Sequence, residues 1–433
     1  MLVAPDRPRE DLVIRGARVL DPGERIDARL DVRIDAGLVT ALGDAVDANG
    51  HRVVDGEGLV LGPAFVDPHV HLRTPGREDE EDIASGTRAA AAGGYCAILA
   101  MPNTEPVVDS AAVLGSLTTR ARREAEIPVG FLAAITKDQA GGELTEMAEL
   151  AEAGAAGFTD DGKPVVEPGL LRRALQYSAV AGRPVALHCE EPTLSRGGHM
   201  HEGETSAELG FGGYPSVAES VMVARDLALA AYEGRPIHLL HLSARESIEA
   251  LRRAQADGVA GTAEVTPHHL AATDEAVRAL DPNVKMNPPL RAEADRRALV
   301  DALRDGTIAA VATDHAPHAR HEKEEPFEAA PFGVTGLETA FAVLNTRLVE
   351  PGVLPLATLV ERMSAGPAAV YGLERPRVAV GAEANLVLLD PGCAWRVEES
   401  AFRSKSANSW VLGETLRGKP VLTVAAGRVA FAA

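Results

Sequence analysis

Residues 65–73 read FVDPHVHLR, an apolar segment that carries two histidines and an arginine at alternate positions. In an extended strand, successive side chains point to opposite faces. His69, His71 and Arg73 therefore share one side of the strand, while the apolar residues between them face the other. The pattern predicts a buried strand whose polar side borders a site rich in imidazole.

The composition excludes several classes of protein. The chain has 433 residues, of which 46% are hydrophobic, enough to bury one large core and an accessory domain. No run approaches the roughly 20 apolar residues of a membrane helix, and the first residues lack the order of a secretory signal, so we expect a cytoplasmic protein without membrane partners. A net charge of -20 disfavours nucleic acid. An anionic substrate must therefore be attracted by individual basic side chains.

The three cysteines predict neither a disulfide framework nor a thiolate zinc site. Cys96, Cys189 and Cys393 are far apart, odd in number and without CxxC spacing. We expect them to be small buried residues.

Eight short apolar runs recur between about residue 60 and residue 318. They are GPAFVDPHVHL, YCAILAMPN, IPVGFLAAIT, AAGFTDDG, RPVALHCE, PIHLLHLS, VAGTAEVTPHH and IAAVATDHAPH. Helical segments are expected between most of them, at 79–92, 110–124, 167–181, 216–232 and 244–257. Strands that alternate with helices indicate a parallel sheet, and eight units favour a (β/α)₈ TIM barrel within the α/β class. An open doubly wound sheet is the alternative, but it does not predict eight units.

The two flanks have a different texture from the middle. Residues 11–60 alternate apolar and polar side chains between Gly, Asp and Pro, as short antiparallel strands do, and the same pattern returns after about residue 380. We therefore expect a small β-rich domain built from both termini. The predicted division is 1–60 and 376–433 for the two parts of that domain, with the barrel at 61–375.

Polar residues gather where the predicted strands end. In a barrel of this kind, the active site lies at the carboxyl ends of the strands. The residues at those ends are His69, His71, Arg73, Asn103, Asp160, Asp161, His188, His241 and Asp314. Imidazole and carboxylate without thiolate suit a catalytic divalent ion such as zinc, which activates water for hydrolysis of an amide.

These segments resemble the dihydroorotases of the amidohydrolase superfamily. The resemblance rests on VDPHVHLR and on MPNT, FTDDG, LHCE, HLS, TPHHL, KMNPPLR and TDHAPH, and it runs through nearly the whole chain. Many relatives carry a carbamylated lysine where this chain has FTDDG, and an aspartate there is the pattern of the bacterial type I enzymes. The resemblance implies the reversible cyclisation of N-carbamoyl-L-aspartate to L-dihydroorotate in pyrimidine biosynthesis.

The resemblance also implies two metal positions joined by a shared carboxylate, with one or two Zn²⁺ ions per chain. The ligands would be His69, His71 and Asp314 on one side, His188 and His241 on the other, and Asp161 between them. A metal-bound hydroxide would attack the amide carbonyl, and Asp314 would act first as general base and then as general acid.

Arg73 is the expected partner of the substrate carboxylate, because a guanidinium offers a planar, bidentate set of donors. By the resemblance, Asn103 and His318 complete the carboxylate pocket and Asn287 meets the edge of the pyrimidine ring. Segment 319–334 has two interpretations. It is either a loop over the mouth, where the backbone of Phe332 and Gly333 touches substrate, or a solvated connection.

Four nearby residues receive a structural interpretation. Asp160 should point away from Asp161 by strand alternation, and Lys163 is expected to be a solvated loop residue rather than a carbamate. His268 and His269 are neighbours on a predicted strand, so their rings should face opposite ways.

Two other functions stay open at this stage. A catalytically silent homologue could act as a scaffold for aspartate transcarbamoylase, but silent relatives have lost metal ligands that are all present here. A hydantoinase or allantoinase is disfavoured by the missing bridging lysine and by Arg73 and Asn103. Partners are expected to be the small substrate and either a second copy of the chain or a transcarbamoylase.

Overall fold

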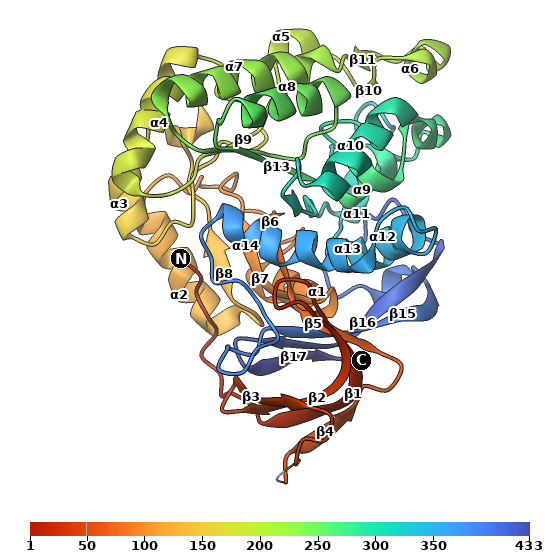
Figure 1. The fold of residues 1–433 in the computed structure, drawn as a ribbon. Helices are drawn as coiled ribbons and strands as arrows, with labels where there is room; N and C mark the ends of the chain where they lie inside the picture. The colour runs from red at the N-terminus through yellow and green to blue at the C-terminus, as the bar shows by residue number, and fades with distance from the viewer. Residues whose placement is uncertain (49) are drawn as a thin grey trace.

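The computed structural model describes residues 1–48 and 50–433. Its larger part is a barrel-like domain with eight parallel strand positions. Two sheets supply seven of them (Figure 1). The first sheet holds β6 (Phe65–Val70), β7 (Tyr95–Ala100) and β8 (Val129–Phe131); the second holds β9 (Ala186–Leu187), β12 (Ile237–Leu239), β13 (Gly261–Val265) and β14 (Ala310–Val311).

The fourth strand position in chain order is reduced to one residue. Phe158 forms parallel bridges with Ala133 and Val185 and so joins the two sheets. On the other side, Val70 forms a parallel bridge with His315, four residues beyond the end of the eighth strand position, β14. The predicted (β/α)₈ order is therefore confirmed, with all eight apolar runs in the order expected.

Helices follow the strands as the sequence predicts. The main ones are α1 (Ile83–Ala92), α2 (Ala111–Glu124), α3 (Met147–Glu152), α4 (Pro168–Ala181), α7 (Val217–Glu233), α8 (Arg245–Ala256) and α10 (Glu293–Asp305). Local sequence explains where they begin and end. Asp82 caps α1 by accepting a hydrogen bond from the backbone of Ser85 at 2.7 Å, and α4 starts with a proline and stops at Gly182 with φ 62°.

Shorter elements fill the connections. They are α5 (Pro192–Ser195), β10 (Met200–His201), α6 (Glu204–Leu209), β11 (Gly213–Tyr214), α9 (Pro267–Ala271), α11 (Arg320–Lys323), α12 (Ala340–Leu344), α13 (Leu356–Met363) and α14 (Ala365–Val370). None of the helices in residues 1–48 and 50–433 is both long and apolar enough to span a bilayer.

Both ends of the chain contribute to one eight-stranded sheet beside the barrel, where the red and dark blue strands of Figure 1 meet. Its strands are β1 (Leu12–Asp21), β2 (Ile26–Asp35), β3 (Leu38–Gly43), β4 (Arg52–Asp55), β5 (Val60–Pro63), β15 (Leu386–Arg396), β16 (Thr415–Ala425) and β17 (Arg428–Ala432). A separate apolar core, which includes Leu12, Ile34 and Leu388, lies against this sheet. The expectation of a β-rich domain built from both termini is confirmed.

Two details of this sheet differ from the expectation of purely antiparallel strands. β1 pairs in parallel with both β4 and β5, while β5 pairs antiparallel with β15. Antiparallel neighbours can be joined by a tight turn, but parallel neighbours need a longer connection. Here the chain passes through β2, β3 and β4 before β5 pairs with β1. β5 of this sheet ends at Pro63, so the boundary predicted after residue 60 falls within β5. The predicted domain limits stay a prediction.

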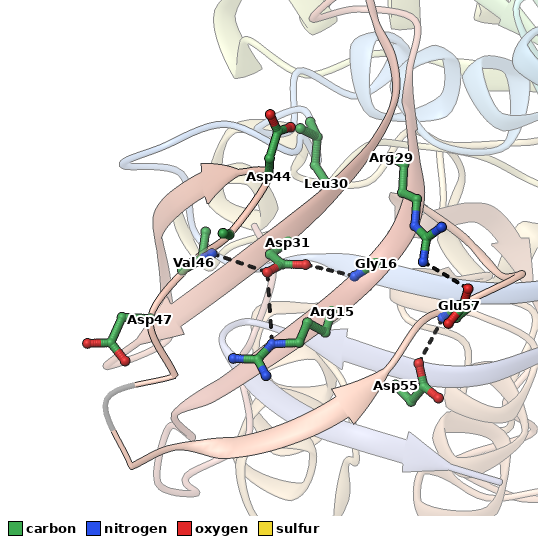
Figure 2. Close-up of a pocket in the computed structure, with 11 residues that line it drawn as sticks. Arg15, Gly16, Arg29, Leu30, Asp31, Asp44, Val46, Asp47, Asp55 and Glu57 are labelled. Atoms are coloured by element: carbon green, nitrogen blue, oxygen red, sulfur yellow. Dashed lines mark hydrogen bonds and ion pairs between the residues drawn. The ribbon is translucent and has the colours of Figure 1, made fainter.

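A cavity of about 740 Å³ lies in the small domain rather than at the barrel mouth. Several of the residues that line it pair with one another within the domain (Figure 2). Asp31 accepts hydrogen bonds from the backbone of Gly16 at 2.8 Å and of Val46 at 3.1 Å, and Arg29 pairs with Glu57 at 2.9 Å. These contacts serve the local fold, so the chemistry must be sought at the strand ends of the barrel.

Candidate metal centre and active site

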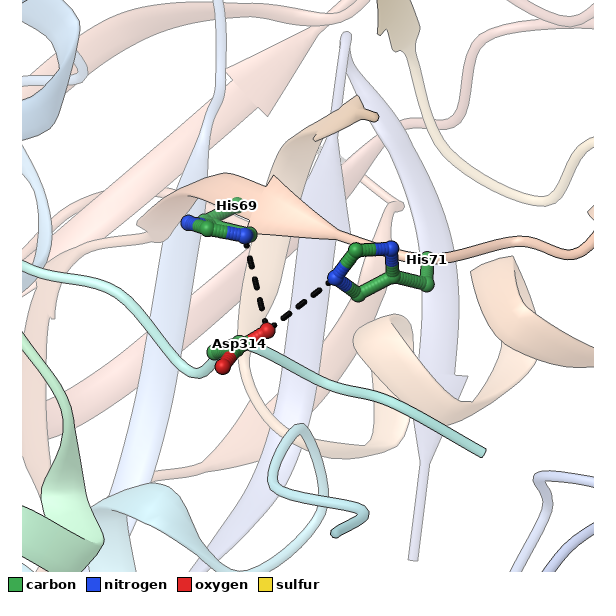
Figure 3. A group of neighbouring side chains, drawn as sticks. All are labelled: His69, His71 and Asp314. Carbon is green, nitrogen blue, oxygen red and sulfur yellow. Dashed lines mark hydrogen bonds and ion pairs between the residues drawn. The ribbon is translucent and has the colours of Figure 1, made fainter. Parts of the chain in front are cut away.

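Two histidines and two aspartates enclose a small volume at the barrel mouth. His69 lies on β6, and His71 follows its end; Asp314 follows β14 and Asp161 follows the Phe158 position. Asp314 Oδ1 lies 3.4 Å from His69 Nε2 and 3.1 Å from His71 Nε2 (Figure 3). Asp161 Oδ2 lies 3.4 Å and 3.5 Å from the same two nitrogens. Four ligand atoms from three separate segments thus face one point.

The second oxygen of Asp161 faces the other two predicted histidines. Asp161 Oδ1 lies 3.4 Å from His241 Nε2 and 3.8 Å from His188 Nδ1. The two imidazole nitrogens are 3.0 Å apart. One carboxylate therefore stands between two pairs of imidazoles, which is the arrangement of a bridging ligand.

The donor set fits divalent metal ions. Ligand atoms at bond lengths of about 2.1 Å around a tetrahedral zinc lie about 3.4 Å from one another, close to the spacings found here. His69 Nε2 and Asp161 Oδ1 are buried and make no hydrogen bond. Buried polar atoms are normally satisfied, so these two lone pairs call for a cation. The groups His69, His71, Asp314 and His69, Asp161, His241 each bring their ligand atoms within 4.8 Å.

The electrostatics of the site also demand positive charge. Burial of His69 opposes its charged form, but the negative charges of Asp161 and Asp314 raise the pKa of His69 well above its ordinary value. Burial likewise opposes ionisation of Asp161, but the neighbouring imidazoles hold its pKa well below the usual range. Protons and metal ions therefore compete for the same lone pairs, and metal binding should release protons.

A buried carboxylate that sequence analysis missed orients His69. Glu264 on β13 accepts a hydrogen bond from His69 Nδ1 at 2.7 Å and one from His238 Nε2 at 3.0 Å. His238 Nδ1 lies 2.9 Å from the Thr262 hydroxyl. Because the Nδ1 proton of His69 is committed to Glu264, its Nε2 lone pair stays available for a metal. The alternate position of Glu264 on an inward-facing strand was the signal that could have revealed it.

Two further residues orient His188 and His71. Glu190 accepts from His188 Nε2 at 2.9 Å, which turns His188 Nδ1 towards Asp161. Burial opposes ionisation of Glu190, but hydrogen bonds from His188 and its other neighbours lower its pKa to about 2. Asn103 Oδ1 lies 2.9 Å from His71 Nδ1, so Asn103 fixes this ring as well as lining the cavity.

A cavity of about 270 Å³ opens directly above these ligands. All predicted substrate contacts line it, together with five of the six predicted metal ligands; His69 lies beneath it, fully buried. The lining residues are His71, Arg73, Asn103, Asp161, Gly162, His188, His241, Asn287, Asp314, Ala316, His318, Phe332 and Gly333. The structure thus brings every sequence-predicted site residue to one place.

Arg73 is held by a carboxylate that sequence analysis did not single out. Its Nε lies 2.9 Å from Glu80 and 3.0 Å from the carbonyl of Pro317. These contacts of Nε leave the two terminal nitrogens of the Arg73 guanidinium for the cavity. One of them, Nη2, lies 3.4 Å from His318 Nε2. Glu80, His318 and Glu322 also form a group of possible metal ligands. Both carboxylates of that group pair with arginines, so we assign it to holding Arg73 and His318 rather than to metal binding.

Two further segments line the cavity, one with Asn287 and one with Phe332 and Gly333. Asn287 donates from Nδ2 to Glu190 at 3.0 Å, while its buried Oδ1 has no hydrogen-bond partner. An unpartnered amide oxygen that lines a cavity is suited to an N–H of a ligand. Segment 319–334 is partly buried, with Phe327 and Ala330 inside and residues 324–326 exposed, and it brings Phe332 and Gly333 to the cavity.

Three site residues adopt a backbone conformation that non-glycine residues rarely use. Arg73, His241 and Asp314 have φ values of 54°, 32° and 49°. Such strain persists only where the surroundings enforce it, and it gathers at functional sites. It arises here because β6, β12 and β14 have ended, so that the chain turns these side chains over the mouth.

The residues assigned structural roles are mostly as expected. Asp160 points away from the cavity and accepts hydrogen bonds from the backbone of Ile135 and Thr136 at 2.8 and 3.1 Å. Lys163 is exposed.

The strand assignment of His268 and His269 was wrong. They are consecutive residues of α9, with ring centroids 4.5 Å apart, because Thr266 and Pro267 are a helix cap and a first-turn proline that end the strand.

The barrel and its carboxylate-bridged histidine pairs define a metal-dependent amidohydrolase. A family model described as dihydro-orotase-like matches residues 58–247. A dihydroorotase of Geobacter sp. (strain M21) is 46% identical over 98% of this chain and 100% of its own length, and one of Syntrophus aciditrophicus is 43% identical over 97% and 99%. The chain therefore belongs to the dihydroorotase family.

A solved structure carries the same architecture. The L-hydantoinase (dihydropyrimidinase) from Arthrobacter aurescens superimposes with a TM-score of 0.87 at 26% identity, over 97% of this chain and 96% of that one. The similarity covers both the barrel and the small β-rich domain, since nearly the whole of each chain is matched.

Replacement Glu264→Gln should weaken metal binding. The amide retains the volume of the carboxylate but no longer enforces the Nδ1 proton on His69, so we expect metal affinity to fall about 10- to 100-fold. Competition with a chelator measures this. Asp21→Asn is the matched control, because Asp21 is a buried carboxylate that accepts from Val378 N in the small domain. Wild-type affinity in Glu264→Gln would contradict the assigned role.

Replacement Asp161→Ala should remove metal from both positions, since this side chain faces both imidazole pairs. Elemental analysis after dialysis measures the loss. Asp160→Asn is the control, because an amide can still accept from Ile135 N and Thr136 N. Full metal content in Asp161→Ala would show that the carboxylate is a spectator.

Proposed function

We propose that this protein catalyses the dihydroorotase reaction, the reversible cyclisation of N-carbamoyl-L-aspartate to L-dihydroorotate in pyrimidine biosynthesis. The observation that carries the proposal is the juxtaposition, in one cavity, of Arg73 and the carboxylate-bridged histidine pairs. Relatives named dihydroorotase match over nearly their full length, which supports the same activity.

The metal ligands in this proposal are those predicted from the sequence. His69, His71 and Asp314 would hold one ion, His188 and His241 would hold the other, and Asp161, which faces both sets, would be shared between them. Divalent ions bound there would polarise the amide carbonyl and lower the pKa of water. We propose Zn²⁺, because sets of imidazole and carboxylate ligands without thiolate suit it in catalytic sites.

Asp314 moves the proton in the proposed mechanism. Burial opposes its ionisation, but His69 and His71 hold its pKa well below the ordinary value, so it is ionised at neutral pH. In ring opening, water adds to the amide carbonyl and gives a proton to Asp314. Asp314 then passes that proton to the ring nitrogen as the C–N bond breaks. Cyclisation follows the same steps in reverse.

The remaining side chains select and orient the substrate. Arg73 pairs with its carboxylate, with Asn103 and His318 beside it, as the bidentate geometry of guanidinium favours. Asn287 accepts from a ring N–H through its unpartnered Oδ1. The backbone of Phe332 and Gly333 borders the bound ring.

We further propose that the enzyme works in the cytoplasm and assembles with a second copy of itself or with aspartate transcarbamoylase. A purely scaffolding role is less well supported, because all six metal ligands are present and their donor atoms converge.

A panel of three cyclic amides separates the possible activities. The metal-loaded protein should hydrolyse L-dihydroorotate much faster than hydantoin or allantoin, because only the first carries the carboxylate that Arg73 would bind. Turnover is followed by loss of ring absorbance and by product chromatography. Preference for hydantoin would favour a hydantoinase, and no turnover of any would favour the scaffold.

Replacement Arg73→Gln should lower kcat/KM for L-dihydroorotate about 100-fold or more, because charged hydrogen bonds to the carboxylate are lost. Bound metal should be retained, since Arg73 is not among the ligands. Arg375→Gln, which removes a partner of Glu24 outside the cavity, is the control and should leave kcat/KM unchanged. Equal activity of Arg73→Gln and wild type would contradict carboxylate recognition by Arg73.

A further inference from the structure

One wall of the cavity is built around a buried lysine. The side chain of Lys285 is almost wholly inaccessible, with 2% of the residue exposed. Its Nζ donates three hydrogen bonds to backbone carbonyls, to Phe327 O at 2.7 Å, Glu328 O at 2.9 Å and Ala330 O at 2.8 Å. An ammonium group has three donors, so its hydrogen-bonding capacity is filled by this one turn of chain.

The conformation of the turn depends on that charge. Three carbonyl oxygens that point to one centre bring their partial negative charges together, which a cation offsets. The ammonium also lies 5.4 Å from the ring centroid of Phe327 and 4.6 Å from that of Phe332, within the range of a cation–π contact. Without the ammonium, the turn would have to expose these carbonyls to water or change shape.

The same turn leads directly to the cavity. Gly333 N donates to the carbonyl of Lys285 at 2.9 Å, so side chain and backbone of the lysine both contact the segment. The carbonyl of Phe332 accepts from His318 Nε2 at 2.8 Å. The positions of Phe332 and Gly333 are therefore set from one side by Lys285 and from the other by His318.

Lys285 is also close in the chain to the second wall, which Asn287 forms. Asn287, two residues later in the motif KMNPPLR, lines the cavity and keeps a buried unpartnered Oδ1. A second lysine, Lys323, strengthens the connection by donating to the carbonyls of Pro282 and Pro331 at 3.0 and 2.8 Å. The side-chain Nζ groups of the two lysines thus tie the chain before Asn287 to the chain before Phe332.

We propose that Lys285 is a positioning residue for substrate binding: it holds the Phe332–Gly333 wall and the Asn287 wall at a fixed separation without touching the substrate. The substrate named in the test rests on the proposed function above, while the role of the lysine in holding the segment does not.

Replacement Lys285→Met tests the proposal, because methionine fills the volume but removes the charge and all three donors. We expect KM for L-dihydroorotate to rise about 10-fold with a change in kcat of less than about 3-fold, since wall separation governs binding more than proton transfer. Metal content should equal that of wild type. Residues 319–334 should exchange amide hydrogens and be cleaved by protease faster than in wild type.

Lys419→Met is the matched control, because Lys419 lies over the ring of Trp395 in the small domain, at 5.5 Å, away from the cavity. It should leave KM, kcat and the protection of 319–334 unchanged. If Lys285→Met does not fold, Lys285→Gln replaces it; this variant keeps two donors and should raise KM in the same direction by a smaller factor.

Two results would overturn the proposal. One is wild-type protection of 319–334 in a folded Lys285 variant; the other is increased exchange there with unchanged KM, which would make the lysine merely structural. Failure of wild type to turn over L-dihydroorotate would count against the proposed function alone, because the exchange measurement requires no turnover.

Discussion

The carboxylate of Asp161 is the constraint on which the site depends. It is buried, and each of its oxygens faces a different pair of imidazoles. A buried negative charge is tolerated only beside compensating positive charge. The surrounding carboxylates therefore act as a framework for cations, and Glu264 and Glu190 turn the rings so that lone pairs rather than N–H groups point inward.

Much of the fold was predictable because it follows from short-range periodicity. All eight apolar runs and the five expected helices were found at or within a few residues of their predicted positions. The parallel pairing of β1 with β4 and β5 was not predictable, since it is decided by which strand reaches an open edge after the chain returns. The error at His268 and His269 was avoidable, because Thr266 and Pro267 are sequence signals of a helix start.

The site residues that follow strand ends were predictable from the sequence. The residues that orient or hold other site residues were much less predictable. His69, Asp161 and Asp314 stand at strand ends, so one topological rule brings them together. Glu264 and Lys285 act through partners nearly two hundred and about forty residues away along the chain. No local spacing encodes these partners; the one local sign is the inward-facing place of Glu264 on β13, which marks the residue but not the histidine that it orients.

The mixed origin of the small sheet has a consequence for how the protein matures. β5 pairs with β1 on one side and with β15 on the other, and the entire barrel is synthesised between β5 and β15. A nascent chain that has just left the ribosome tunnel thus carries β1 to β5 with an unpaired edge until the final strands emerge. Exposed strand edges invite association with other chains. Translation of β15 is then the step that ends this exposure.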